Sequence, residues 1–248
     1  MSNVLTFDID WAPDWAIDDC IDICRAGNVP ATFFATHRST TLGRLLQDPS
    51  FEVGIHPNFL PGSSHGSSSS EVLSFFRELV PGAVSMRTHA LHQSTRIFSE
   101  VLEQSPRIRA DVSLFLPGHP NLKPTLLFIG AQRPLIRFPY WWEDDVASYT
   151  PDWDWRPPSP SSDLRIFDFR PVHVALNMRS MTAYQRLKAA TGGAFSTATR
   201  DDFKPFVERN LPGTATFLKE LIERLGADSF TTVRDLLSGI EESERPVG

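Results

Sequence analysis

The sequence predicts an α/β fold, in which helices cover a parallel β-sheet or barrel, formed by a single domain over residues 1–248. Short apolar segments typical of buried strands alternate with amphipathic segments typical of helices over most of the chain. The length of 248 residues also suits one domain, since α/β barrels often reach about 200–250 residues. No internal repeat and no strong break between domains interrupts the alternation.

The first half of the chain follows this alternation regularly. Residues 4–8 predict a short apolar strand, and Pro13 and Asp14 open a helix that Gly27 ends. Apolar residues inside that helix recur at helical spacing, as Ile17 and Ile21 do. The elements expected next are strands at 31–35, 51–56, 83–88 and 110–116, helices at 42–47, 71–80 and 94–103, and a loop of small residues at 61–70.

The second half is less regular but keeps the same character. The expected elements are apolar strands at 125–129 and 135–138, a Pro- and Trp-rich loop at 151–162, a buried strand at 164–176, a helix at 214–225, a strand at 229–231 and a closing helix at 232–241. Gly226 ends the helix at 214–225. Helices and strands thus continue to alternate up to the C-terminus, as one α/β domain requires.

Charge and composition exclude several classes of protein. The 24 Lys and Arg residues face 30 Asp and Glu residues, for a net charge of −6, which argues against a nucleic-acid-binding protein. No apolar run approaches the roughly 18 residues of a membrane span, and the N-terminus does not resemble a secretory signal. Cys20 and Cys24, four apart on a helix, are poorly placed for a disulfide and fit a reducing cytoplasm. We therefore expect a cytoplasmic protein, with its oligomeric state open.

Polar residues that suit acid–base or metal chemistry follow the expected strands. They are Asp8 and Asp10 after the first strand, His56 after the third, Arg87 and His89 after the fourth, and His173 in the late strand at 164–176. In a parallel barrel the C-terminal ends of the strands meet on one face, and that face holds the active site. The pattern therefore predicts that these distant residues share one cleft, although any one of them alone is equally typical of a cap or a surface group.

The two aspartates and the histidines indicate a metal site. Asp8 and Asp10, two apart on a strand, would point the same way, and a cation beside them would relieve their repulsion. One carboxylate can bind the metal while the other accepts a proton. One Asp with two His residues would leave zinc an open position for water. The candidates for the two histidines are His56 and His65, although His65 could instead be an exposed residue of the flexible loop, and the aspartates could cap the following turn.

Further residues also suit a hydrolase. Arg87 can hold a carboxylate by two hydrogen bonds, and His173 is either a satisfied core histidine or a general acid. Of His89 and His92, one is expected to line the cleft. Aromatic residues followed by acids occupy residues 140–145, where they offer faces and hydrogen-bond acceptors to sugar rings, unless the tryptophans belong to the core.

At these residues the chain resembles the polysaccharide deacetylases of the NodB-homology or carbohydrate esterase family 4 group, and its cytoplasmic branch associated with O-antigen and surface-polysaccharide biosynthesis. The resemblance runs through nearly the whole chain and rests on residues 6–10, 31–35, 52–56 and 230–237. It implies a distorted (β/α)7 barrel similar to a TIM barrel. It also implies one polysaccharide deacetylase-like domain over residues 1–248.

The resemblance also assigns roles to residues. Asp8 matches the catalytic base, Asp10 a metal ligand, Arg87 the arginine that orients the base, and His173 the acid that protonates the leaving amine. His56 matches the first histidine of the family's His-x-x-x-His motif. The residue four positions later is Leu60, so His65 is the nearest candidate for the second histidine ligand. Residues 141–145 are similar to the aromatic and acidic fourth motif. The expected substrate-binding residues are His89, Tyr140, Trp141, Trp142 and Asp144.

The function expected from this pattern is metal-dependent removal of an N-acetyl or related N-acyl group from an amino sugar or glycan. The metal is expected to be divalent, zinc foremost, with cobalt, nickel, manganese or iron as alternatives. One alternative function is amide or formamide hydrolysis on a small non-carbohydrate compound. The other is an inactive carbohydrate-binding protein, which the displaced second histidine leaves open. The sequence identifies neither the sugar nor its carrier.

Overall fold

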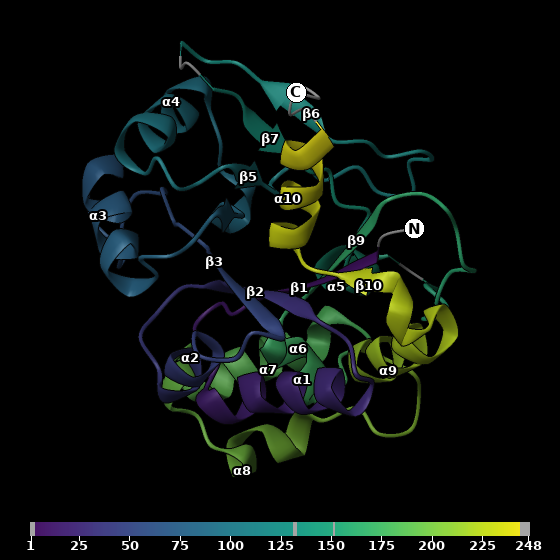
Figure 1. The fold of residues 1–248 in the computed structure, drawn as a ribbon. Helices are drawn as coiled ribbons and strands as arrows, with labels where there is room; N and C mark the ends of the chain where they lie inside the picture. Colours follow the sequence, from purple (N-terminus) through teal and green to yellow (C-terminus); the bar gives the residue numbers. More distant parts are fainter. Residues whose placement is uncertain (1–2, 131–132, 151, 244–248) are drawn as a thin grey trace.

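A computed structural model describes residues 3–130, 133–150 and 152–243, and its centre is a curled sheet surrounded by helices (Figure 1). The strands are β1 (Asn3–Asp8), β2 (Ala31–Ala35), β3 (Phe51–Ile55), β4 (Ser85–Met86), β5 (Ala110–Asp111), β6 (Thr125–Leu127), β7 (Leu135–Arg137), β8 (Trp142–Glu143), β9 (Arg165–Phe169) and β10 (Phe230–Thr231). Their order is β6-β7-β5-β4-β3-β2-β1-β9-β8, and β10 also pairs with β1. Within the described residues, β6 with β7 is the one antiparallel strand pair.

The segment formed by residues 135–143 joins the two ends of this sheet. At its start β7 pairs with β5, and further along the backbone N–H of Tyr140 donates to the carbonyl of Leu114 at 2.9 Å. At its end β8 pairs with β9, which places Trp142 opposite Phe167. The sheet therefore curls back on itself, and the expected distorted (β/α)7 barrel is confirmed.

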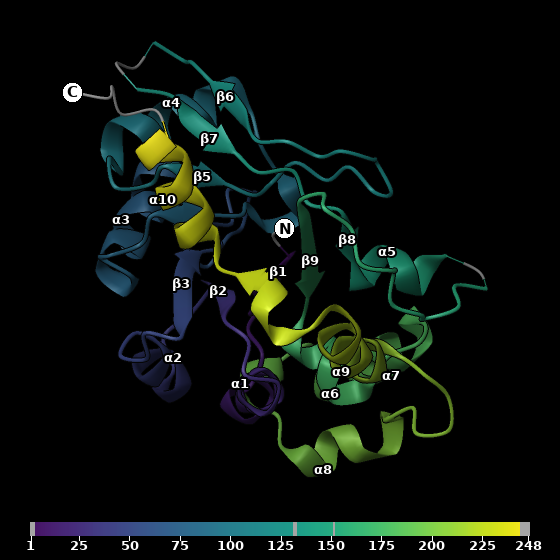
Figure 2. The ribbon, with the colours of Figure 1, turned by 45° about the vertical axis from the view of Figure 1, so that its right-hand side comes forward.

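Helices pack around the curled sheet in two groups. They are α1 (Asp14–Ala26), α2 (Thr40–Leu45), α3 (Ser69–Leu79), α4 (Thr95–Gln104), α5 (Asp144–Tyr149), α6 (Pro171–Leu176), α7 (Met181–Thr191), α8 (Arg200–Phe203), α9 (Thr214–Leu225) and α10 (Val233–Ser243). Figure 2 shows α6, α7 and α9 beside α1, and α3 near α4 on the other side of the sheet. Capping fits the sequence, since the side chains of Ser68 and Ser94 accept the backbone N–H groups of Glu71 and Ile97 at the starts of α3 and α4.

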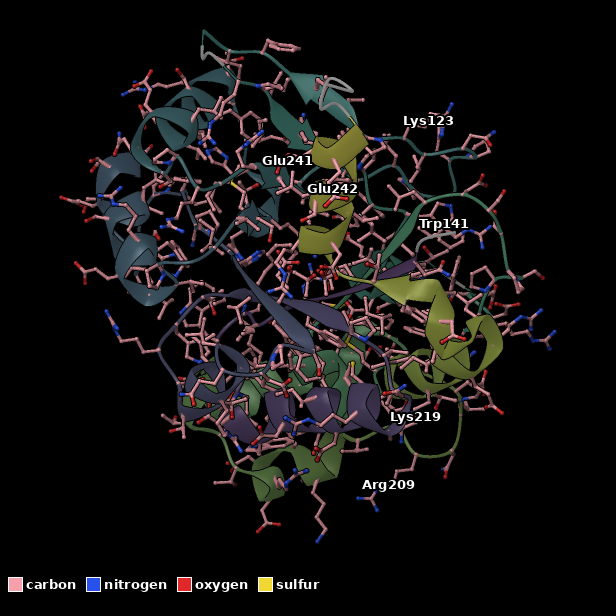
Figure 3. All side chains as sticks on the ribbon, viewed as in Figure 1. Lys123, Trp141, Arg209, Lys219, Glu241 and Glu242 are labelled. Atoms are coloured by element: carbon pink, nitrogen blue, oxygen red, sulfur yellow. The ribbon has the colours of Figure 1, made fainter. Side chains whose placement is uncertain are left out.

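Apolar side chains fill the space between these layers. All six residues of β1 are buried, and Phe7 stacks on Phe33 of β2 with the ring centroids 4.7 Å apart. Figure 3 shows side chains crowding the interior, whereas the labelled Arg209 and Lys219 are exposed at the periphery. No helix among the described residues is both long and apolar enough to cross a membrane.

The prediction of one strand at 164–176 is wrong. The chain forms β9 up to Phe169 and then turns into α6, which begins at Pro171. Proline suits the first position of a helix because its missing N–H would have no partner there. The sequence also did not predict α7, whose polar and apolar residues separate poorly between its faces. Both differences matter because α6 and α7 contribute residues to the candidate site.

Candidate active site

The polar residues expected to converge do so at the C-terminal ends of the parallel strands. They come from the ends of β1, β3, β4, β8 and β9 and from α6, and the group consists of Asp8, Asp10, His56, Arg87, His89, Asp144, Asp145, Asp168, Arg170 and His173. Two of these, Asp168 and Arg170, were not singled out from the sequence. The structure therefore brings together, at this face, most of the residues expected to share one cleft.

Three side chains form a compact triangle of possible ligand atoms. The Oδ1 atom of Asp10 lies 3.3 Å from Nε2 of His56 and 3.1 Å from Nδ1 of His89. The two histidine nitrogens are 3.2 Å apart. His56 is 2% exposed, whereas His89 reaches the cavity with a partly exposed ring. The hydrogen bond and charge of His56 outweigh burial and lower the pKa of Asp10 well below its usual value, with help from His89 and Arg170.

A tight turn after β1 separates Asp10 from Asp8. Asp10 and Trp11 have positive φ angles of 44° and 55°, and the N–H of Ala12 donates to the carbonyl of Ile9 at 2.8 Å. Such angles are uncommon for residues other than glycine and often occur at functional sites. Both carboxylates approach the imidazole of His56, Asp10 at Nε2 and Asp8 at Nδ1. Asp10 reaches the histidines, and Asp8 stays 1% exposed beneath them.

Arg87 holds two buried carboxylates together. Its Nη1 atom donates to Oδ1 of Asp8 at 2.9 Å and also to Oδ1 of Asp168. Its Nη2 atom donates to the hydroxyl of Thr6 at 2.9 Å, and Nε donates to the carbonyl of Val112. Arg87 is fully buried, and a buried charge requires such partners. The expected contact between Arg87 and Asp8 is present, and Asp168 is a partner that sequence reasoning missed.

Arg170 links the triangle to a second acidic group. Its Nε atom donates to Oδ2 of Asp10 at 3.1 Å, and Nη1 donates to Oδ1 of Asp144 at 2.8 Å. Its Nη2 atom lies 3.1 Å from Oδ2 of Asp145. Arg170 directly follows β9, so its place at a strand end was the sequence signal that could have identified it. Its guanidinium fixes Asp10 relative to the acids around His173.

His173 lies in the same cavity as the triangle. A cavity of about 210 Å³ is lined by Asp10, His56, His89, Arg170 and His173, among others. The Nδ1 atom of His173 lies 3.1 Å from Oδ1 of Asp144. Burial disfavours the charged form of Asp144, but His173 and Arg170 lower its pKa overall. The structure therefore places the imidazole of His173, with carboxylates beside its Nδ1 atom, in the same cavity as the candidate metal ligands.

The structure places His65 outside the triangle. Its Nδ1 atom accepts the N–H of Asn58 at 3.1 Å, and its Nε2 atom donates to the carbonyl of Thr36 at 2.8 Å. Its ring stacks on Trp11 and Phe75. Both ring nitrogens of His65 have backbone partners, so His65 lies apart from Asp10 and His56, and His89 is the histidine that joins them. His89, expected to bind substrate, is the third corner instead.

The aromatic and acidic segment is also more buried than expected. Tyr140 is fully buried and its hydroxyl donates to Glu143 at 2.7 Å, while Trp142 stacks on Phe217 with the centroids 4.4 Å apart. Asp144 is fully buried. None of these three lines the cavity of the triangle, and their contacts in the structure are packing or supporting ones. Trp141 is partly exposed and lines a separate cavity of about 290 Å³.

The residues of the triangle fit a divalent metal ion. A tetrahedral zinc with bonds of about 2.0–2.1 Å has ligand atoms about 3.3 Å apart, close to the 3.1–3.3 Å sides of the triangle. The Nδ1 atom of His56 is buried without a hydrogen-bond partner and lies 3.6 Å from Oδ1 of Asp8. At metal sites a carboxylate commonly accepts a hydrogen bond from the ring nitrogen of a histidine ligand that does not bind the metal, and this orients the ring.

The local charge also favours a cation. Five aspartates of the site surround two arginine side chains, Arg87 and Arg170. Burial raises the pKa of Asp168 well above its usual value, although Arg87 opposes this. Buried negative charge without compensation is costly. A divalent cation at the triangle would offset the remaining excess.

Comparisons with known proteins show the family of the chain. The family model described as WbmS-like polysaccharide deacetylase matches residues 5–188. A crystal structure from Bordetella bronchiseptica, of a candidate polysaccharide deacetylase described as involved in O-antigen biosynthesis, is 34% identical, covers 90% of both chains and has a TM-score of 0.74. The Xyl-CE4 domain of a multidomain xylanase from the hindgut metagenome of Trinervitermes trinervoides is 14% identical, covers 98% of this chain and 92% of its own, and has a TM-score of 0.43. No curated protein matches. The family match and the 34% identical structure confirm the resemblance seen in the sequence, and the chain belongs to the WbmS-like polysaccharide deacetylases.

Proposed function

We propose that this protein is a metal-dependent hydrolase that removes an N-acetyl or related N-acyl group from an amino sugar during surface-polysaccharide (O-antigen) biosynthesis. The observation that carries the proposal is the triangle of Asp10, His56 and His89 in one cavity with His173. Family membership and the description of the relative from Bordetella bronchiseptica support the glycan substrate. The free cysteines, both buried, support a cytoplasmic location.

Asp10, His56 and His89 would hold the metal. One carboxylate oxygen and two imidazole nitrogens suit zinc best and also cobalt, nickel, manganese or iron. A bound divalent cation would supply Lewis acidity, which polarises an amide carbonyl and lowers the pKa of water towards about 7. Arg170 keeps the Oδ2 atom of Asp10 occupied, so that Oδ1 faces the two histidines.

Asp8 is the proposed base. Arg87 holds its carboxylate in place, and Asp8 would take the proton of the attacking water. Asp8 also lies 3.6 Å from Nδ1 of His56, so it could instead orient that ligand. Asp8→Asn separates the two roles. Loss of the base lowers turnover while zinc affinity is kept, whereas loss of an orienting partner weakens zinc binding about 10–100-fold.

His173 is the proposed acid. An amide nitrogen leaves poorly as an anion, so a positioned proton donor assists the break of the C–N bond. His173 lines the cavity, and Asp144 and Asp145 lie within ion-pair distance of its Nδ1 atom. From this position the imidazole can donate a proton to the amine.

The rival functions have less support. The hypothesis of an inactive carbohydrate-binding protein depended on the lack of a second histidine ligand. The position of His89 beside Asp10 and His56 weakens that hypothesis. Hydrolysis of small formamides gains no specific support from the site. We therefore keep the amino-sugar N-deacylase as the proposed function.

The test is release of acetate by purified protein after chelation and reloading with zinc. The substrates are N-acetylated amino sugars in free, nucleotide-linked and oligosaccharide form, with simple formamides as the contrasting set. Asp10→Asn should lose both zinc and turnover, whereas Asp154→Asn, the same change at an exposed carboxylate, should keep both. Turnover of the formamides alone, or full turnover by the chelated protein, would contradict the proposal.

A further inference from the structure

Tyr184 occupies a position in the cavity to which the proposed function assigns no role. It lies on α7 and is partly exposed, and it lines the same cavity as Asp10 and His173. Its ring meets the imidazole of His173 edge to face, with centroids 5.0 Å apart, and it packs on Phe195 at 5.4 Å. The packing on both sides fixes the phenol at the wall of the cavity.

The hydroxyl of Tyr184 is a hydrogen-bond donor without a partner. No hydrogen bond joins this hydroxyl to another of the described residues. The hydroxyl oxygen is also not among the buried polar atoms that lack a partner, so it is accessible from the cavity. Burial raises the pKa of Tyr184 to about 12, and the charges of Asp10 and Asp145 act in the same direction. The phenol therefore keeps its proton at neutral pH. Tyr140, by contrast, is fully buried and donates to Glu143.

Part of the wall of this cavity is apolar. Val172, Met181 and Phe195 line it together with Tyr184 and with the aspartate and histidines of the triangle. Donors in a site with little water stabilise developing negative charge more strongly than donors in bulk water do. A protonated phenol in such a wall is suited to an oxygen that becomes negative during the reaction.

We propose that the Tyr184 hydroxyl donates a hydrogen bond to the oxygen of the scissile amide, an inference that rests on the proposed N-deacylase function. When water attacks, the new C–O bond forms, the electron pair of the C=O bond moves to this oxygen, and the water proton goes to Asp8. When the C–N bond breaks, the oxygen regains its double bond, and the nitrogen takes the bond pair and a proton from His173. Tyr184 keeps its own proton throughout.

The first test compares Tyr184→Phe with Tyr149→Phe, the same change at a 64% exposed tyrosine of α5. We expect Tyr184→Phe to lower kcat about 100-fold, as loss of one oxyanion donor does in other hydrolases. KM and the melting temperature should stay near those of the native protein, because the hydroxyl makes no bond in the folded chain. Tyr149→Phe should change none of these values. Native kcat in Tyr184→Phe would overturn the inference.

The second test does not depend on turnover. Methylphosphonate carries tetrahedral, negatively charged oxygens, and its binding to zinc-loaded protein can be measured by calorimetry. Tyr184→Phe should weaken this binding about 10-fold, a magnitude typical of a hydrogen bond to a charged group. If the native protein hydrolyses no amide, the proposed function fails while this loss of affinity still supports the role of Tyr184. Equal affinity in both proteins, or no binding by either, would overturn that role.

Discussion

Replacing His89 tests the geometry of the site most directly. His89→Ala removes one corner of the triangle and leaves Asp10 Oδ1 and His56 Nε2, 3.3 Å apart, as the remaining pair. Zinc sites with four protein ligands bind with apparent free energies of about 10–16 kcal/mol. One ligand then contributes about 2.5–4 kcal/mol, so we expect the Kd for zinc to rise about 10²–10³-fold.

The matched comparison is His65→Gln, at the histidine that the sequence placed in the metal site. Its ring nitrogens bind Asn58 and Thr36, so this change should leave the zinc Kd within about threefold of the native value. The same change should lower stability by about 1–3 kcal/mol, because two buried hydrogen bonds are disturbed.

Competition with a chromophoric chelator measures the zinc Kd of all three proteins, and urea unfolding measures their stability. The reasoning would be refuted if His65→Gln lost zinc while His89→Ala kept native affinity. That result would mean that the loop around His65 rearranges to complete the site when metal binds, and that His89 serves another purpose.

Three further changes probe other parts of the site. His173→Gln should lower kcat about 10²–10⁴-fold while zinc affinity stays native, which steady-state kinetics and the chelator assay check together; weaker zinc binding would argue against a role confined to proton transfer. Burial lowers the pKa of His65 to about 4. Its neutral form therefore contributes stability above its unfolded pKa of about 6.5, which is lost as the pH falls from 6.5 towards 4. Urea unfolding should accordingly show the advantage of the native protein over His65→Gln shrinking across that window, and a constant difference would contradict this. Arg87→Met should destabilise the fold by about 3–5 kcal/mol, because Asp8 and Asp168 lose their buried cation. Adding Asp168→Asn to Arg87→Met should restore part of that loss in thermal unfolding, and no recovery would show that the two carboxylates do not depend on Arg87.

Arg170 explains why the site acts as one unit. Its guanidinium contacts Asp10 of the triangle and both acids beside His173. Burial opposes its charge, but the surrounding carboxylates raise its pKa well above the usual value, so it remains charged. A substitution at Asp10 therefore changes the electrostatic environment of the acids beside His173, and the reverse also holds. We expect the effects of paired substitutions on either side of Arg170 on activity to be non-additive.

The sequence by itself determined the order of strands and helices in the first half of the chain and the face that carries the chemistry. β2 at 31–35 and α9 at 214–225 have the predicted bounds, because apolar periodicity and terminating glycines are local signals. Asp10, His56 and Arg87 were singled out because each lies at or soon after the end of a predicted strand, whereas His173 was expected inside a strand and lies on α6.

Tertiary structure alone decided which histidine joins Asp10. His65 lies in the loop after β3 and His89 lies soon after β4, but the turn at Asp10 and the pairing of β3 with β4 bring His89 to His56. Asp168, Arg170 and Tyr184 likewise acquired their places through contacts between segments far apart in the chain. The physical reason is that a ligand set depends on distances of about 3 Å between side chains, and such distances are set by how strands pair and turns close rather than by local propensity.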